Sequence, residues 1–253
     1  QPTIRGGGVG QLIAVAVGGI GATFVLADDS ASLLPTLLIV SAAIGVGVVG
    51  LVEDIKGLKT STRASFQILI GAVFGFLVTA TWGKPWVWAI GAMLVFAAYV
   101  NFANFMDGVN GMSSLHGFVV GIAFFCIGWS QGLTWLSIVG MILAVAFILF
   151  LPWNLNPPGM FLGDVGSYLL GGAIAALFVA TVTAGISPLT ALAPLAIYLS
   201  DTGWTLLCRA SNGQSIFEAH RSHTYQRLTN TGLSHMQVST VVALLTALTS
   251  AVG

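Results

Sequence analysis

The chain has 253 residues, of which 56% are hydrophobic and only 6% are charged, and it contains 32 glycines. Soluble domains usually carry about 25% charged residues, so this composition excludes a water-soluble monomer. It indicates an integral membrane protein, where glycine within helices is tolerated. The formal net charge is zero, which gives no electrostatic basis for a nucleic-acid partner.

Apolar runs follow one another along the whole chain. A helix that spans a bilayer needs about 20 apolar residues. The sequence therefore predicts an all-α, polytopic transmembrane bundle forming a single domain over residues 1–253. We expect about nine spanning helices, at residues 9–27, 34–52, 64–82, 86–105, 115–130, 133–152, 167–185, 188–207 and 236–253.

The connections between these runs form two unequal sets. If they alternate between the two sides of the membrane, one set comprises residues 1–8, 53–63, 106–114, 153–166 and 208–235. This set holds seven of the eight Lys and Arg residues, and Lys84 alone lies in the other. The positive-inside rule assigns the basic set to the cytoplasm. We therefore expect a multi-pass protein of the cell (inner) membrane with an active site facing the cytoplasm.

The first polar motif, EDIKGLKTSTR, follows the second apolar run. Glu53 and Asp54 are adjacent there and are followed by Lys56, Lys59 and Arg63. A pair of carboxylates among cations suits a divalent metal, or a base held ionised beside a phosphate. The alternative is a solvated loop whose mixed charge only sets the topology.

The second motif, NFANFMDGVNGM, closes the fourth run. Asn101, Asn104 and Asp107 recur every three residues, so they fall along one side of a helix as it leaves the membrane. Two glycines then break the helix around Asn110. Oxygen ligands at a helix C-terminus favour a cation. Asparagines can also join helices within lipid, which is the structural alternative.

The third motif, FLGDVGS, opens the seventh run with Asp164 and Ser167. Backbone N–H groups at such a helix start can bind phosphate, and a carboxylate beside them can hold the accompanying magnesium. Alternatively, Asp164 or Ser167 only caps the helix.

The last basic loop, EAHRSHTYQR, offers His220, Arg221 and His223. Guanidinium groups bind phosphate oxygens in bidentate fashion, so this spacing favours a diphosphate clamp over an incomplete zinc site. Asp201 lies upstream within an apolar run, where a charge costs at least a few kcal/mol unless it is paired. It is either functional or satisfied for packing reasons, and the sequence leaves both open.

Together the motifs predict a cluster of carboxylates, carboxamides, arginines and histidines at one membrane face. Hard oxygen ligands indicate magnesium, with manganese as the alternative, and the basic groups indicate a phosphorylated substrate. The chemistry that fits is phosphoryl transfer from a soluble donor to a lipid acceptor. The rival interpretations are a membrane transporter or channel with a cytoplasmic polar vestibule, and an inactive scaffold.

At these motifs the chain resembles the polyprenyl-phosphate N-acetylhexosamine-1-phosphate transferases of glycosyltransferase family 4, which include phospho-N-acetylmuramoyl-pentapeptide transferase. PTIRGGG at 2–8, EDIKGLKTSTRASFQ, NFANFMDGVNGM, FLGDVGS and HRSH follow in the family's order. The resemblance implies about ten or eleven spanning helices, the first of which would precede PTIRGGG and be missing here. It also implies transfer of a sugar 1-phosphate from a UDP-sugar to undecaprenyl phosphate, with release of UMP and use of magnesium.

The same resemblance assigns roles to ten residues. It implies that Asp164 and Asn104 are metal ligands, that Glu53, Asp54 and Asp107 are catalytic, and that the substrate is bound by Asn110, Arg63, His220, Arg221 and His223. Glu53 stands where the family usually has an aspartate, and Arg63 where it has a lysine. The HRSH loop differs from the histidine triplet of the muramoyl-pentapeptide enzymes and looks closer to transferases that act on N-acetylfucosamine or related amino sugars in O-antigen or capsule assembly, so we expect a UDP-amino sugar as donor. A homodimer is left open.

Overall fold

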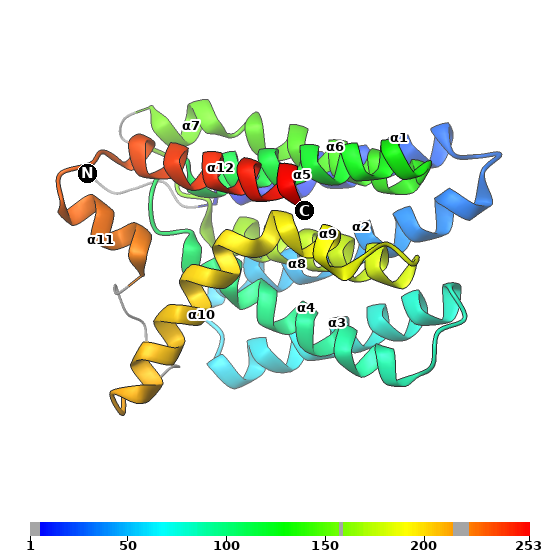
Figure 1. Cartoon of the computed structure of the whole chain (residues 1–253), viewed down its shortest axis with the longest axis horizontal. Helices are drawn as coiled ribbons and strands as arrows, with labels where there is room; N and C mark the ends of the chain where they lie inside the picture. Colours follow the sequence, from blue (N-terminus) through cyan, green and yellow to red (C-terminus); the bar gives the residue numbers. More distant parts are fainter. Residues whose placement is uncertain (1–5, 157–158, 215–222) are drawn as a thin grey trace.

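The computed structural model describes residues 6–156, 159–214 and 223–253. Within those residues every regular element is a helix (Figure 1). The helices are α1 (Gly8–Val25), α2 (Ser30–Lys56), α3 (Thr60–Thr81), α4 (Val87–Met106), α5 (Met112–Gln131), α6 (Thr134–Ile148), α7 (Leu151–Leu155), α8 (Gly163–Thr183), α9 (Pro188–Leu192), a 3-10 turn (Ala193–Leu195), α10 (Ala196–Ser211), α11 (Thr224–Asn230) and α12 (His235–Val252).

The long helices confirm the all-α membrane bundle. In the described part of the chain, eight helical segments are long and apolar enough to cross a membrane, with α6 and α7 counted as one. They run roughly side by side along the long axis of the molecule (Figure 1). Large apolar side chains such as Phe24 and Phe76 are exposed on their outer faces, as expected of surfaces that lie against lipid. The protein is therefore a multi-pass membrane protein.

The prediction of one spanning helix over residues 188–207 is wrong. That stretch is divided into α9, the 3-10 turn and α10, and it is absent from the helices suited to crossing a membrane. Pro194 lies at the division, where it removes a backbone donor and breaks the helical ladder. The second piece, α10, runs obliquely away from the other helices (Figure 1).

Helix α8 forms the centre of the bundle, and 89% of its membrane-spanning window is buried. Glycines on two of its faces allow this. A Cβ on Gly171 would lie 2.7 Å from the Cα of Val100 in α4, and one on Gly172 would lie 2.4 Å from a methyl group of Val46 in α2. Because small residues let helix backbones approach closely, α2 and α4 reach the side chains near the start of α8.

One end of the bundle gathers the polar motifs. The start of α1 is bound to the segment before α8, since the Gly8 N–H donates to the Leu162 carbonyl over 2.8 Å. The end of α4 contacts α8 through a hydrogen bond of 2.7 Å from Nδ2 of Asn104 to Oδ1 of Asp164. The start of α12 reaches the turn after α4, where Ser239 donates to the Asn110 carbonyl. Motifs separated along the chain therefore meet at a single site.

Candidate functional site

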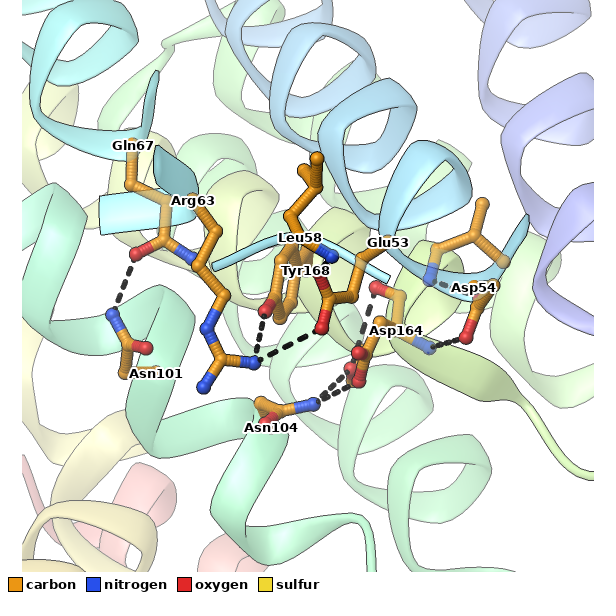
Figure 2. A network of polar contacts seen from close by, with 11 residues as sticks. Glu53, Asp54, Leu58, Arg63, Gln67, Asn101, Asn104, Asp164 and Tyr168 are labelled. Atoms are coloured by element: carbon orange, nitrogen blue, oxygen red, sulfur yellow. Dashed lines mark hydrogen bonds and ion pairs between the residues drawn. The ribbon is translucent and has the colours of Figure 1, made fainter. Parts of the chain in front are cut away.

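Asp54 caps the helix that carries Asp164. Its Oδ1 accepts a hydrogen bond from the backbone N–H of Asp164 over 3.0 Å, and its Oδ2 accepts one from Val165 over 2.9 Å. Figure 2 shows Asp54 beside Asp164 at the end of α2. The interpretation in which Asp164 or Ser167 caps its own helix is wrong, because the cap comes from α2. These two N–H groups are also occupied by Asp54, so they are not open to a phosphate.

Glycine at position 163 makes room for this cap. Its φ is +75°, which lies in the left-handed region that favours glycine, and a Cβ there would lie 2.7 Å from Oδ2 of Asp54. The glycine before Asp164 in the sequence motif is therefore required by the approach of the Asp54 carboxylate.

Asn104 joins α4 to the same carboxylate. Its Nδ2 donates to Oδ1 of Asp164 over 2.7 Å and to Oγ of Ser167 over 2.9 Å. Asn104 and Asp164 point toward each other in Figure 2. The two residues expected to be metal ligands are thus in direct contact, although they are 60 positions apart in the sequence.

The Asp164 carboxylate at this contact is the kind of ligand that a magnesium ion shared with a substrate would use. Within the described residues, no three His, Cys, Asp or Glu side chains are grouped closely enough to hold a metal by themselves. Mg²⁺ is commonly bound through one or two carboxylates together with substrate phosphates and water. Asp164 supplies a carboxylate of that kind, whereas Asn104 directs its Nδ2, a hydrogen-bond donor, at Asp164, so the role of its amide oxygen as a metal ligand stays a prediction.

Glu53 and Arg63 form the neighbouring part of the site. Oε2 of Glu53 accepts from the Leu58 N–H over 2.6 Å, and its Oε1 lies 3.5 Å from Nη1 of Arg63. The same Nη1 donates to the hydroxyl of Tyr168 over 3.4 Å (Figure 2). The sequence reasoning missed Tyr168. Its spacing of four residues from Asp164, which places both on one face of α8, was the available signal.

Asn101 has a different neighbour. Its Nδ2 donates to Oε1 of Gln67 in α3 over 2.7 Å and to the Ala97 carbonyl over 2.8 Å. The three polar residues at the end of α4 therefore have different roles. Asn101 joins helices, as the structural alternative for this motif predicted, whereas Asn104 faces Asp164.

Asp107 follows α4 directly and has its own environment. Its Oδ1 accepts a hydrogen bond from Ser113 Oγ over 2.6 Å. The pKa of Asp107 is raised to about 6, mainly by burial and also by the nearby carboxylates of Asp164 and Asp54, and against the opposing effect of the Ser113 hydrogen bond. A carboxylate with this pKa is ionised at neutral pH and can accept a proton there.

The turn that contains Asn110 is held by its backbone. The Asn110 carbonyl accepts from Ser239 Oγ over 2.9 Å, and its N–H donates to Nδ1 of His235 over 3.4 Å. The Gly111 N–H donates to Oδ1 of Asn154, a buried residue that the sequence reasoning missed. These contacts are made by the Asn110 backbone. The binding of substrate by its side chain, which the resemblance implies, stays a prediction.

The histidine motif is described only in part. His220 and Arg221 lie outside the described residues. His223 is buried and directly precedes α11. Its ring centroid lies 6.2 Å from that of Phe105 at the end of α4 and 5.7 Å from that of Tyr225. The one described member of the motif is therefore close to the end of α4.

Comparison with known proteins shows the family of the chain. The family model for Glycosyl transferase family 4 matches residues 36–182. The chain is 31% identical over 168 residues to the phospho-N-acetylmuramoyl-pentapeptide-transferase of Geobacillus kaustophilus. This alignment covers 58% of this chain and 52% of the relative. It is 29% identical over 243 residues to the undecaprenyl-phosphate alpha-N-acetylglucosaminyl 1-phosphate transferase of Escherichia coli, which covers 87% of this chain and 65% of the relative.

A third relative, the phospho-N-acetylmuramoyl-pentapeptide-transferase of Symbiobacterium thermophilum, is 32% identical over 195 residues, covering 64% of this chain and 56% of the relative. The alignments thus span about half the length of these pentapeptide-transferase relatives. The matched family region begins within α2 and ends within α8, and so it contains Asp54, Asn104, Asp107 and Asp164. The chain belongs to glycosyl transferase family 4.

Proposed function

We propose that this protein transfers a sugar 1-phosphate, of the N-acetylhexosamine type, from a UDP-sugar to undecaprenyl phosphate and releases UMP. The observation that carries the proposal is the contact of Asn104 with Asp164, whose helix Asp54 caps, because it brings polar side chains from three helices to one point. Two relatives, named as a phospho-N-acetylmuramoyl-pentapeptide-transferase and an undecaprenyl-phosphate alpha-N-acetylglucosaminyl 1-phosphate transferase, support the same chemistry.

The donor diphosphate would lie against Asp164 and Asn104. Bound there with the substrate, Mg²⁺ would neutralise the charge of the diphosphate oxygens. Arg63 would lie beside them, held by Glu53 and Tyr168, and its guanidinium suits phosphate oxygens. The chain's own contribution is to hold these groups in a fixed relation before the substrates arrive.

Asp107 is the residue that fits proton transfer. Its pKa of about 6 is close to the second pKa of a phosphate monoester, also about 6. Asp54 and Glu53 accept hydrogen bonds from backbone N–H groups through three of their four carboxylate oxygens, so these two residues fit a holding role. Asp107 would therefore take the remaining proton from the lipid phosphate.

The reaction then balances as a single displacement. An oxygen of the lipid phosphate forms a bond to the β-phosphorus of the UDP-sugar. The bond from that phosphorus to the bridging oxygen breaks, and the oxygen leaves with its electron pair as part of UMP. The product is a lipid-linked sugar diphosphate, and the proton taken from the lipid phosphate passes from Asp107 to solvent.

The lipid acceptor has an apolar surface next to the site. A groove of about 350 Å³ lies between α4, α10, α11 and α12, and its lining includes Met106, Ile197, Leu228 and Val242. Met106 directly precedes Asp107. A polyprenyl chain in this groove would place its phosphate near the carboxylates.

We further propose that the site faces the cytoplasm of the inner membrane. At the site end of the bundle, Lys56 is the last residue of α2, Lys59 directly precedes α3 and Arg63 lies near the start of α3. Arg209 lies in the last turn of α10, whereas Lys84 is in the turn after α3 at the opposite end. This distribution follows the positive-inside rule.

The test is UMP release by the purified protein with undecaprenyl phosphate and a panel of UDP-amino sugars. Turnover with at least one donor that requires the lipid phosphate is expected, and Asp164→Ala should abolish it. Absence of turnover with every donor, in protein shown to be folded, would contradict the proposal. Donor-independent ion flux through the protein in vesicles would favour the transporter instead.

A further inference from the structure

Asp201, the acidic residue within an apolar run, caps a helix that belongs to a different part of the chain. Its Oδ1 accepts a hydrogen bond from the backbone N–H of Thr224 over 2.7 Å, and its Oδ2 accepts one from Tyr225 over 3.4 Å. These are the first two N–H groups of α11. Both carboxylate oxygens are therefore used to hold α11 against α10.

Tyr225 provides a second tether, to α4. Its hydroxyl donates to the Phe105 carbonyl over 2.8 Å and accepts from Nε2 of Gln226 over 3.1 Å. The fit is close, because a Cβ on Gly108 would lie 2.2 Å from this hydroxyl oxygen. Burial, with the charges of Asp107 and Asp201, raises the pKa of Tyr225, so the phenol stays neutral and remains a donor.

The two tethers meet at the histidine motif. His223 directly precedes Thr224, is 1% exposed, and lies with its ring near Phe105 and Tyr225. The position of His223 thus depends on α11, and α11 is held by Asp201 from one side and by the end of α4 from the other. The same end of α4 carries Asp107.

We propose that Asp201 and Tyr225 are a positioning pair for the transfer reaction: they fix His223, and with it the substrate contact proposed for this residue, at the Asp107 end of α4. The proposal rests on the proposed function. The sequence left open whether Asp201 is functional or satisfied for packing reasons; a cap needs only an oxygen that accepts hydrogen bonds, whereas a role that depends on charge needs the carboxylate.

The test compares Asp201→Ala, Asp201→Asn and Tyr225→Phe with wild type. Asparagine keeps one oxygen acceptor and removes the charge, so a cap is partly retained in Asp201→Asn and lost in Asp201→Ala. Asp29→Ala is the matched control, because Asp29 caps α2 through its own carboxylate, accepting from the Ser32 N–H over 3.1 Å, at the other end of the bundle.

Two readouts separate this proposal from the proposed function. The first is amide hydrogen exchange of peptides covering residues 224–230, measured in detergent or nanodiscs without substrate. Exchange should be faster in Asp201→Ala and Tyr225→Phe than in wild type, with peptides from α8 unchanged. This readout does not depend on any activity.

The second readout is steady-state UMP release. Asp201→Ala should lower kcat/KM for the UDP-sugar by about tenfold or more, since displacing a positioning group by about 1 Å can cost up to about 100-fold. Asp201→Asn should lie between Asp201→Ala and wild type, Asp29→Ala should match wild type, and the double variant Asp201→Ala with Tyr225→Phe should lose less than the product of the two single losses.

Unchanged exchange at residues 224–230 in Asp201→Ala would overturn the proposal, as would wild-type kcat/KM in a variant whose exchange had increased. Equal losses in Asp201→Asn and Asp201→Ala would also overturn it, because the charge would then be what matters. If wild type released no UMP while exchange responded as expected, the tether would be established and the proposed function would fail alone.

Discussion

The Asp54 carboxylate at the end of α2 caps the first turn of α8 and thereby holds Asp164, which lies 110 residues later in the chain. One carboxylate thus sets the position of another. The backbone of the cap is further confined by close contact between the two helices, since Gly50 in α2 faces the Asp164 carbonyl. The geometry of the site is therefore built into the packing of α2 on α8.

Removing the cap should displace Asp164. We expect Asp54→Ala to cost about 1–2 kcal/mol of stability and to lower turnover by about 100-fold, as measured by thermal unfolding in detergent and by UMP release. Asp54→Asn, which keeps one oxygen acceptor, should lose less of both. Equal turnover in the two variants would mean that Asp54 acts through its charge or as a base instead.

The contact between α2 and α8 can be tested with two alanines on one helix. A Cβ on Gly50 would lie 2.3 Å from the Asp164 carbonyl oxygen, whereas one on Gly45 would meet only the Ile70 side chain at 3.6 Å. We expect Gly50→Ala to lower the unfolding temperature and turnover together, because the backbone must shift, and Gly45→Ala to leave both near wild type. Normal turnover in Gly50→Ala would show that Asp164 tolerates that shift.

Much of this architecture was accessible from the sequence. Runs of about 20 apolar residues predicted the spanning helices, and the spacing of polar residues at their ends predicted which motifs would meet. The motifs of Asn104 and Asp164 were singled out because polar residues are scarce in a chain with only 6% charged residues, and the resemblance to glycosyltransferase family 4 made the two residues a pair. Where polar groups are this rare, their positions carry most of the information about the site.

The partners of individual side chains were not accessible. Asp54 was expected to assist the metal or act as a base, and nothing local to EDIKG indicates that its oxygens are bound to the start of α8. The break at Pro194 was hidden by the apolar residues on both sides of it. The role of Asp201 likewise depends on Thr224, 23 residues away, and such contacts are set by tertiary packing, which the hydropathy pattern does not encode.

The raised pKa of Asp107 predicts the pH dependence of the reaction. The ionised carboxylate is the proton acceptor, so kcat should rise with pH through an apparent pKa of about 6 and then level off. Asp107→Asn should remove this rise of kcat with pH, the acidic limb of the pH profile, and lower kcat by about 100-fold or more. The pH profile of UMP release between pH 5 and 8 measures both; a limb that persists unchanged in Asp107→Asn would belong to another group.

Because the Ser113 hydrogen bond lowers the pKa of Asp107, a variant of Ser113 checks that the pH dependence belongs to Asp107. The Ser113 hydroxyl stabilises the ionised form of Asp107 and lowers its pKa, so Ser113→Ala should move the limb to higher pH. Ser114→Ala is the control, since the Ser114 hydroxyl is buried and has no hydrogen-bond partner in the described part of the chain. A limb that shifted equally in both variants would not report on Asp107.

Metal dependence should follow Asn104. Chelation of divalent ions is expected to stop UMP release, and added Mg²⁺ to restore it. Asn104→Ala should raise the Mg²⁺ concentration needed for half-maximal activity by about tenfold or more, because one oxygen ligand is lost. Asn101→Ala, whose bonds are to Gln67 and Ala97, should leave the Mg²⁺ requirement unchanged. Equal Mg²⁺ curves for wild type and Asn104→Ala would remove Asn104 from the metal site.

The most direct test of the central claim follows the β-phosphate itself. A UDP-sugar labelled in its β-phosphate is incubated with undecaprenyl phosphate and the protein, and the label is traced in the lipid and aqueous phases. The convergence of Asp164, Asn104 and Asp107 predicts that wild type moves the label into the lipid with equimolar UMP, and that Asp164→Asn does not. Label that remains in soluble UDP while the sugar enters the lipid, or transfer that persists in Asp164→Asn, would contradict it.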